Sequence, residues 1–354
     1  CRSAYVRGRA ARRFDAWRGA APSLHTELIT LVGCAGHVIR WRCPAGLTMV
    51  AHSWGRLLEG AHERRSANPQ PVRQADPPSP RDDFLSGTSG TVGGLDAVRR
   101  AVRDETVSAW EILSAKRARL ALASRHTPPL RRVLALSVER PQHRQLTDAI
   151  HAELLRSRHN VEVHTTQPDG RGKFENLNLL LAECEEGEMG ETPINEYDWL
   201  LVIDDDVELP QGFVDRFLFL CERFSLSLAQ PAHRLHSHAA WPVTRRHPGS
   251  VVRETSFVEI GPVTAFAKPT FPVLLPFPEL RMGWGLDMHW AALARQHGWR
   301  CGIVDAVAIR HRVAPAAAGY GREQAVAEAR SFLATRPYLS AHEAAQTLST
   351  HRSW

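Results

Sequence analysis

The sequence predicts an α/β fold in which a mostly parallel sheet is flanked by helices. From Leu130 onward, short apolar strands alternate with segments whose apolar residues recur at helical spacing, a pattern typical of a parallel sheet covered by helices. An acidic triplet, Asp204-Asp205-Asp206, directly follows one of these strands. Because ligands of such folds bind beyond the carboxyl ends of the strands, the triplet also indicates where a site lies.

The alternation begins at the first apolar strand and continues through three further strands, with a helix between each pair. In chain order we expect a strand at 133–138, a helix at 146–154, a strand at 161–165, a helix at 174–184, a strand at 199–203, a helix at 213–224 and a strand at 226–230. Beyond these we expect a β-rich stretch at 257–266, a proline-broken loop at 269–278, a helix at 287–297 and a strand at 301–309.

Four segments describe the domain organisation. Residues 1–94 form a basic, partly disordered and partly helical extension that ends in a Pro-, Gly- and Ser-rich linker at 66–94, and residues 1–48 show no convincing period. Residues 95–125 form a helix, the α/β domain covers 126–320, and 321–354 form a helical tail. The helix at 95–125 is predicted from the spacing of its apolar residues, which are Leu95, Val98, Val102, Trp110 and Leu113.

Composition indicates a cytoplasmic protein. None of the six cysteines belongs to a Cys-x-x-Cys pair, which fits a reducing compartment. No apolar run approaches the ~20 residues of a membrane span, although peripheral membrane contact stays open. The chain has a net charge of +6 and a pI of about 9.3, but eight arginines lie in residues 1–48 alone. The basic excess is therefore local, and no recognition motif supports a nucleic-acid partner.

The acidic triplet predicts a cation site. Residues two apart at a strand end project to the same side, so Asp204 and Asp206 can converge while Asp205 faces away. Carboxylate oxygens suit Mg²⁺ or Mn²⁺, and such an ion would also bridge the phosphates of a nucleotide. The alternative is a solvated acidic turn in front of the next helix.

A family resemblance adds to this interpretation. The segment Gly172-Lys-Phe-Glu-Asn-Leu-Asn-Leu, followed later by Leu200-Leu-Val-Ile-Asp-Asp-Asp-Val-Glu-Leu-Pro, resembles the family 2 glycosyltransferases and their GT-A relatives over roughly residues 131–312. The resemblance implies a nucleotide-diphosphate-sugar donor. It also implies these roles: Asp204 near the ribose or the metal, Asp206 as principal metal ligand, Lys173 near the nucleotide, and Asp169 of Asp169-Gly170 at the nucleoside. Asp205, which strand alternation sets apart from the converging pair, is expected on the donor side, toward the sugar.

A second motif opens the helix at 287–297. In Arg281-Met-Gly-Trp-Gly-Leu-Asp-Met-His-Trp, the two glycines allow a tight backbone that exposes the face of Trp284 for stacking on a sugar ring. The segment resembles the Gly-Trp-Gly-x-Glu-Asp motif of inverting GT-A enzymes, although Leu286 replaces the Glu. The resemblance makes Asp287 the candidate catalytic base, and an Asp at a helix start also acts as an N-cap.

Two further residues complete the candidate site. His311, in Ala308-Ile-Arg-His-Arg, matches by position the histidine with which many GT-A enzymes complete the metal site. Glu259 is a weaker candidate on the acceptor side, where it would alternate away from its apolar strand neighbours and face the cleft. A zinc site at His233, His236 and His238 is not favoured, because no fourth ligand accompanies them.

The combined prediction is a Mn²⁺- or Mg²⁺-dependent glycosyltransferase that moves a hexose to an unknown hydroxyl acceptor, with inversion through an Asp base. One alternative is a sugar-nucleotide nucleotidylyltransferase, but the loop Ser137-Val-Glu-Arg-Pro-Gln after the first strand lacks the glycines expected of that class. Another is a non-catalytic nucleotide- or glycan-binding relative of such enzymes.

Overall fold

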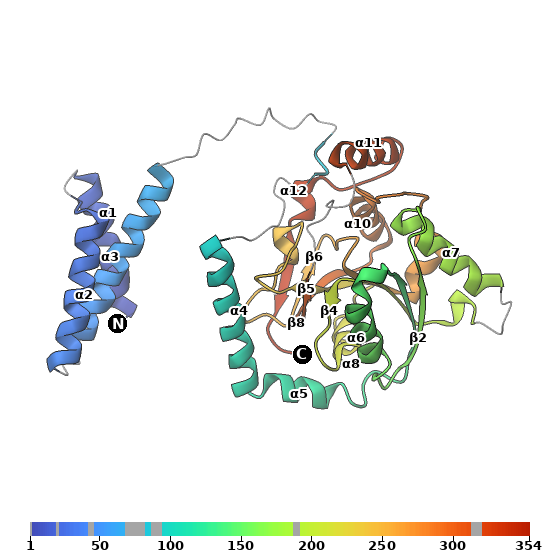
Figure 1. Ribbon diagram of the computed structural model, residues 1–354, viewed down its shortest axis with the longest axis horizontal. Coiled ribbons are helices and arrows are strands. Elements are labelled where there is room, and N and C mark those ends of the chain that lie inside the picture. Colours follow the sequence, from blue (N-terminus) through green and yellow to red (C-terminus); the bar gives the residue numbers. More distant parts are fainter. Residues whose placement is uncertain are drawn as a thin grey trace. The chain divides into compact units, whose positions relative to one another are not determined.

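The computed structural model describes residues 2–18, 21–41, 46–67, 82–85, 94–186, 192–312 and 321–354. The chain divides into two compact units, Cys1–Pro77 and Pro78–Trp354. Figure 1 shows the first unit as helices and the second as a sheet surrounded by helices. Most of the linker expected at residues 66–94 lies outside the described residues.

The first unit consists of the helices α1 (Arg2–Trp17), α2 (Leu24–Trp41) and α3 (Gly46–Ala67). Most of the described residues within 1–48 are therefore helical, although the sequence showed no convincing period there. The reason is that these helices do not meet through an apolar stripe. Arg12 and Glu27 form a buried ion pair at 3.3 Å, and Gly8 lies so close to α3 that a Cβ there would overlap the carbonyl oxygen of His52.

Nine strands among the described residues form the sheet of the second unit. They are β1 (Arg132–Val138), β2 (Asn160–Thr166), β3 (Trp199–Ile203), β4 (Val207–Glu208), β5 (Leu228–His233), β6 (Val252–Thr255), β7 (Val263–Ala267), β8 (Cys301–His311) and β9 (Thr347–His351). Their order is β2-β1-β3-β7-β5-β8-β6-β9, and β4 pairs with β8. Strands β4, β6 and β7 run against the other six, so one direction predominates as predicted.

The helices of the second unit account for the other predicted elements. They are α4 (Gly94–Leu113), α5 (Lys116–Ala123), α6 (Arg144–Leu154), α7 (Lys173–Glu186), α8 (Phe213–Arg223), α9 (Phe271–Leu274), α10 (Leu286–His297), α11 (Arg322–Leu333) and α12 (Ala341–Ala344). None of the helices described in the chain is long and apolar enough to cross a membrane.

The central strands are buried on both faces, which explains why they read as continuous apolar runs. Leu134 and Leu200 point to one face, where the core includes residues of α7, α10 and α11. Val133 and Leu201 point to the other face, where α5, α6 and α8 pack. The result is a sheet between two helical layers (Figure 1). Strands β1 and β3 are parallel neighbours, so their carboxyl ends lie at the same edge of the sheet.

Three predicted elements differ in the structure. The expected β-rich stretch at 257–266 becomes a strand only at Val263, because side chains satisfy the preceding backbone: Gln230 accepts the N–H of Glu259, and Thr255 donates to the Phe257 carbonyl. The helix expected at 95–125 is broken at Ala115, whose φ is 54°.

The third difference is in the tail expected to be helical at 321–354. Its residues Thr347–His351 form β9, which pairs antiparallel with β6. This edge strand is polar and half exposed, so it lacks the apolar alternation by which strands are recognised in a sequence.

Candidate active site

The acidic triplet lies where β3 ends. The backbone N–H of Asp204 donates to the carbonyl of Pro262 at 2.7 Å, which holds the start of the triplet against the segment before β7. One side-chain atom each from Asp204, Asp206 and His311 lie within 4.8 Å of one another. The structure thus brings together the three residues expected to hold a cation.

The pairing of β4 with β8 explains how His311 reaches the cluster. Val207 lies opposite His311 in this pairing, and the N–H of Arg312 donates to the carbonyl of Asp206 at 2.8 Å. Nε2 of His311 lies 2.9 Å from Oδ1 of Asp206. Burial lowers the pKa of His311, but the hydrogen bond to Asp206 and the negative charges of Asp206, Asp204 and Glu259 together outweigh burial and leave this pKa above its ordinary value.

Asp205 faces away from the cluster, as strand alternation predicts. Its oxygens accept hydrogen bonds from Nε and Nη2 of Arg140 at 2.9 and 2.5 Å, and from the Arg140 backbone N–H at 2.8 Å. Burial acts to raise the pKa of Asp205, but the bonds from Arg140 hold it below its usual value. Because Arg140 engages both oxygens, Asp205 joins the segments that follow β1 and β3. Its expected place toward the sugar stays a prediction.

Lys173 stands beside the cluster at the start of α7. Its Nζ lies 2.6 Å from Oδ1 of Asp204 and donates to the carbonyl of Ile260 at 2.9 Å. Gly261 allows this approach, since a Cβ there would lie 2.8 Å from Oδ2 of Asp204. The ammonium group of Lys173 is therefore fixed next to Asp204. The resemblance placed this lysine near the nucleotide.

The segment 281–285 is fixed by α11. The carboxylate of Glu328 accepts the backbone N–H groups of Arg281, Met282 and Gly283 at 2.8 to 2.9 Å. The carbonyl of Arg281 in turn accepts the N–H of Lys173 at 3.1 Å. The Gly-Trp-Gly segment is thus connected to the residue that contacts Asp204.

Trp284 is half buried and packs against the core, with the guanidinium of Arg322 5.8 Å from its ring centroid. Its suggested role as a sugar platform stays a prediction, and Arg322 stands over the ring in this structure. Asp287 lies in the first turn of α10, whose N-cap is Gly285 and not Asp287. The expectation that Asp287 is the N-cap is therefore wrong, because α10 begins directly after Gly285, whose φ is 82°.

Asp287 and Glu259 are both buried carboxylates. Burial, with a smaller contribution from the charge of Glu259, raises the pKa of Asp287 to about 7. Glu259 accepts hydrogen bonds from the N–H of Trp241 at 3.0 Å and the hydroxyl of Thr244 at 2.6 Å. Glu259 therefore lies in an irregular, buried segment and not on the cleft-facing strand that was expected.

Asp169 is exposed in the turn after β2, with φ of 43°, and Gly170 follows with φ of 75°. The carbonyl of Gly170 accepts a 2.8 Å bond from Arg281. Among the described residues, no hydrogen bond or ion pair joins Asp169 to the acidic cluster. Its nucleoside contact stays a prediction.

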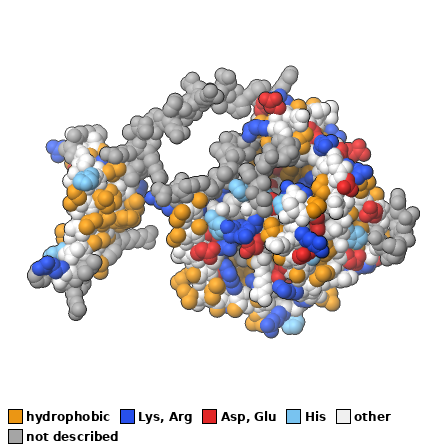
Figure 2. Space-filling model, viewed as in Figure 1, with side chains coloured by type: hydrophobic (Ala, Val, Ile, Leu, Met, Phe, Trp, Pro, Cys, Tyr) orange, Lys and Arg blue, Asp and Glu red, His pale blue; other side chains and the backbone are white. Residues whose placement is uncertain are grey.

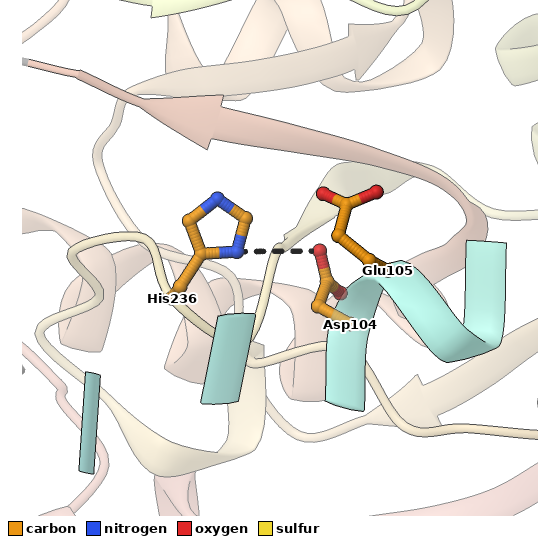
Figure 3. A group of neighbouring side chains, drawn as sticks. All are labelled: Asp104, Glu105 and His236. Carbon is orange, nitrogen blue, oxygen red and sulfur yellow. Dashed lines mark ion pairs between the residues drawn. The ribbon is translucent and has the colours of Figure 1, made fainter. Parts of the chain in front are cut away.

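Two groups of side chains have metal-ligand spacing in the described residues, and their chemistry separates them. Asp204, Asp206 and His311 offer two carboxylates and an imidazole, a donor set that suits Mn²⁺ or Mg²⁺. Asp104, Glu105 and His236 form the second group, with Nδ1 of His236 3.4 Å from Asp104 (Figure 3). Two arginines pair with the single carboxylate of Asp104 there. Asp204 and Asp206 each lie near one basic side chain, Lys173 at 2.6 Å and Arg140 at 3.7 Å, so the first group fits a cation better.

Arg140 and Glu328 were not anticipated from the sequence. Arg140 lies in the loop after β1, where the sequence shows only that the glycines of a nucleotidylyltransferase are missing. Its position directly after a buried strand is a signal that could have identified it as a site residue. Glu328 is on a helix far along the chain, and no local pattern connects it to the Gly-Trp-Gly segment. Only the packing of α11 reveals its role.

Comparisons with known proteins give little further identification. No protein-family model matches the chain, and no curated protein matches its sequence. A structure search finds the crystal structure of GalNAc-T7 with UDP, GalNAc and Mn²⁺, at 9% sequence identity and a TM-score of 0.34. The alignment covers 53% of this chain and 44% of that chain.

Proposed function

We propose that this protein is a GT-A type glycosyltransferase, which transfers a hexose from a nucleotide-diphosphate sugar to a hydroxyl acceptor with the help of a divalent cation. The observation that carries the proposal is the convergence of Asp204, Asp206 and His311 at the carboxyl end of β3. In α/β folds this edge of the sheet is where ligands bind. The sequence motifs around these residues support the same reaction class.

Asp204, Asp206 and His311 would hold Mn²⁺ or Mg²⁺, which supplies positive charge to the departing nucleoside diphosphate. Lys173 would add a second positive charge at the same place, because its ammonium group is already fixed against Asp204. The donor phosphates would thus meet two cationic centres.

Asp287 would accept the proton of the acceptor hydroxyl. A general base works best when its pKa is near the working pH, and burial raises the pKa of Asp287 to about 7. Glu259, held by Trp241 and Thr244, keeps a second carboxylate in this region. Trp284 would contribute an apolar face to the sugar pocket.

The metal site is tested by a thermal-shift series with nucleoside diphosphates, each with and without Mn²⁺. We expect a metal-dependent rise in melting temperature for one nucleotide, and loss of that rise in Asp206→Asn with the fold retained. Glu208→Gln is the matched control, since Glu208 is an exposed acid two residues further on that pairs with Arg312. If the wild-type protein shows no metal-dependent shift with any nucleotide, the metal-site assignment is wrong.

Transfer is separated from mere binding by measuring nucleoside diphosphate release from a panel of donor sugars. Asp287→Asn should keep the metal-dependent nucleotide shift and lose release. Binding without release by the wild-type protein would instead identify a non-catalytic relative.

A further inference from the structure

Helix α4 packs against the rest of the second unit with its polar side inward. Asp104, Ser108 and Glu111, spaced four and three residues apart, share one face of the helix and are all buried. The carboxylate of Asp104, at 0% exposure, accepts hydrogen bonds from Arg234 at 2.5 Å and Arg246 at 3.2 Å. This face is therefore attached by buried charges.

Arg246 extends the attachment toward the end of α4. Nη2 of Arg246 lies 2.7 Å from Glu111, and its Nη1 donates to the hydroxyl of Ser108 at 3.2 Å. Arg246 is itself buried. With three contacts spread over two turns, the helix cannot rotate without breaking the network, so its orientation is fixed.

The opposite face of α4 is apolar and exposed. Val98, Val102 and Leu113 are spaced so that they share this face, and Trp110 lies beside them. Trp110 is 70% and Leu113 81% exposed. Figure 2 shows hydrophobic side chains along this edge of the second unit. An amphipathic helix on a soluble domain normally buries its apolar face, so this orientation indicates that something else covers it.

The charges beside this face select the occupant. Arg99 and Arg103 are exposed next to the apolar residues, and Arg119 is exposed on α5. A second copy related by a twofold axis would bring two surfaces of the same sign of charge together. Residues 1–77 are also basic, with twelve arginines and five acidic residues. An anionic lipid surface is complementary to both the apolar and the basic residues.

The first unit offers an independent observation of the same kind. Its interior contains the ion pairs of Arg12 with Glu27 and of Arg56 with Glu27, at 3.3 and 2.9 Å. Large apolar side chains are exposed on its helices instead: Val6, Phe14, Leu28, Ile29, Val32, Leu47, Met49, Trp54 and Leu58. Helices that expose apolar side chains and also carry arginines therefore occur in both units.

We propose that the outward face of α4, formed by Val98, Val102, Trp110 and Leu113 with Arg99 and Arg103 beside it, docks on an anionic membrane surface. The helix would lie in the plane of the interface, with Trp110 at headgroup depth. This docking is independent of the proposed sugar transfer.

Flotation of the full chain with vesicles tests the proposal. Vesicles of phosphatidylcholine alone are compared with vesicles that also contain phosphatidylglycerol in roughly equal amount. We expect binding to the anionic vesicles that weakens with added salt, and a fall of about tenfold or more in the partition coefficient for Val102→Ser/Trp110→Ser/Leu113→Ser. Leu155→Ser/Leu348→Ser is the matched control, because these side chains are similarly exposed, at 66% and 64%, on other parts of the second unit.

A charge variant, Arg99→Gln/Arg103→Gln, should reduce binding to the vesicles that contain phosphatidylglycerol. It should leave binding to the phosphatidylcholine vesicles unchanged. The proposal is overturned if the triple variant partitions like the wild-type chain, which would place lipid binding elsewhere. It is equally overturned if the wild-type chain ignores both vesicles, or if light scattering shows a dimer that the triple variant dissociates, which would identify a second copy as the occupant.

Discussion

At the residue scale, three adjacent aspartates have different surroundings. Asp204 meets Lys173, Asp205 meets Arg140, and Asp206 meets His311. The triplet lies in the turn between β3 and β4, where the middle residue faces away from the other two, and the neighbouring elements supply a different partner to each. A run of identical side chains can thus provide both a candidate cation site and the ion pair that supports it.

The Arg140–Asp205 pair leads to a prediction about stability. Arg140→Met should destabilise the fold by about 2–4 kcal/mol, because the buried Asp205 carboxylate loses its guanidinium partner and keeps the backbone N–H of residue 140 and Nδ1 of His143 at 3.2 Å. Adding Asp205→Asn to that variant should recover part of the loss, since the buried charge is then removed. Urea unfolding of the three variants measures both effects. Additive losses in the double variant would contradict the pairing.

Asp287 predicts a pH dependence with a definite sign. Its pKa in the folded protein is about 7, above the ordinary value of 3.8, so ionising it costs stability as pH rises between these values. Asp287→Asn should therefore stabilise the fold by on the order of a few kcal/mol at pH 8 and hardly at all below pH 4. Melting temperatures across this range check the sign, and donor turnover by the wild-type protein should rise through pH 7. A stability difference that is constant with pH would contradict the raised pKa.

At the element scale, α4 shows how buried charges can orient a helix against its hydrophobic pattern. The apolar spacing of Val98, Val102 and Leu113 predicts a helix correctly, but it would also predict that this face is buried. The structure reverses the orientation, because Asp104 and Glu111 meet arginines contributed by the segment after β5.

The two neighbouring acids of α4 test this account. Asp104→Asn should cost about 3–5 kcal/mol of stability and expose α4 to proteolysis, because Asp104 is fully buried between Arg234 and Arg246. Glu105→Gln is the control and should cost less than about 1 kcal/mol, because Glu105 is largely exposed. Burial acts to raise the pKa of Asp104, but the bond to Arg234 and the charges of Arg234 and Arg246 together hold it below its ordinary 3.8. The contribution of Asp104 to stability is therefore lost as pH falls below that value. Equal effects of the two variants would contradict the attachment.

At the scale of the whole molecule, the chain forms two compact units with different construction. The proposed site draws its residues only from the second unit. Deletion of residues 1–77 should therefore leave the metal-dependent nucleotide shift unchanged within about twofold in affinity, whereas it should weaken vesicle binding. Calorimetry with nucleotide and Mn²⁺ on both forms makes the comparison. Loss of nucleotide binding on deletion would mean that the first unit contributes to the site.

The sequence by itself determined the sheet strands from β1 to β3, the helices between them and the acidic triplet, because buried parallel strands and amphipathic helices carry strong periodic signals. Alternation along β3 was enough to pair Asp204 with Asp206. Contacts between distant segments were decided only by the tertiary structure. The β4–β8 pairing brings His311 to Asp206, Glu328 holds the Gly-Trp-Gly segment, and β9 joins the sheet without an apolar pattern. The orientation of α4 belongs with these, since a helix period shows which residues share a face but not which face the rest of the chain will bury.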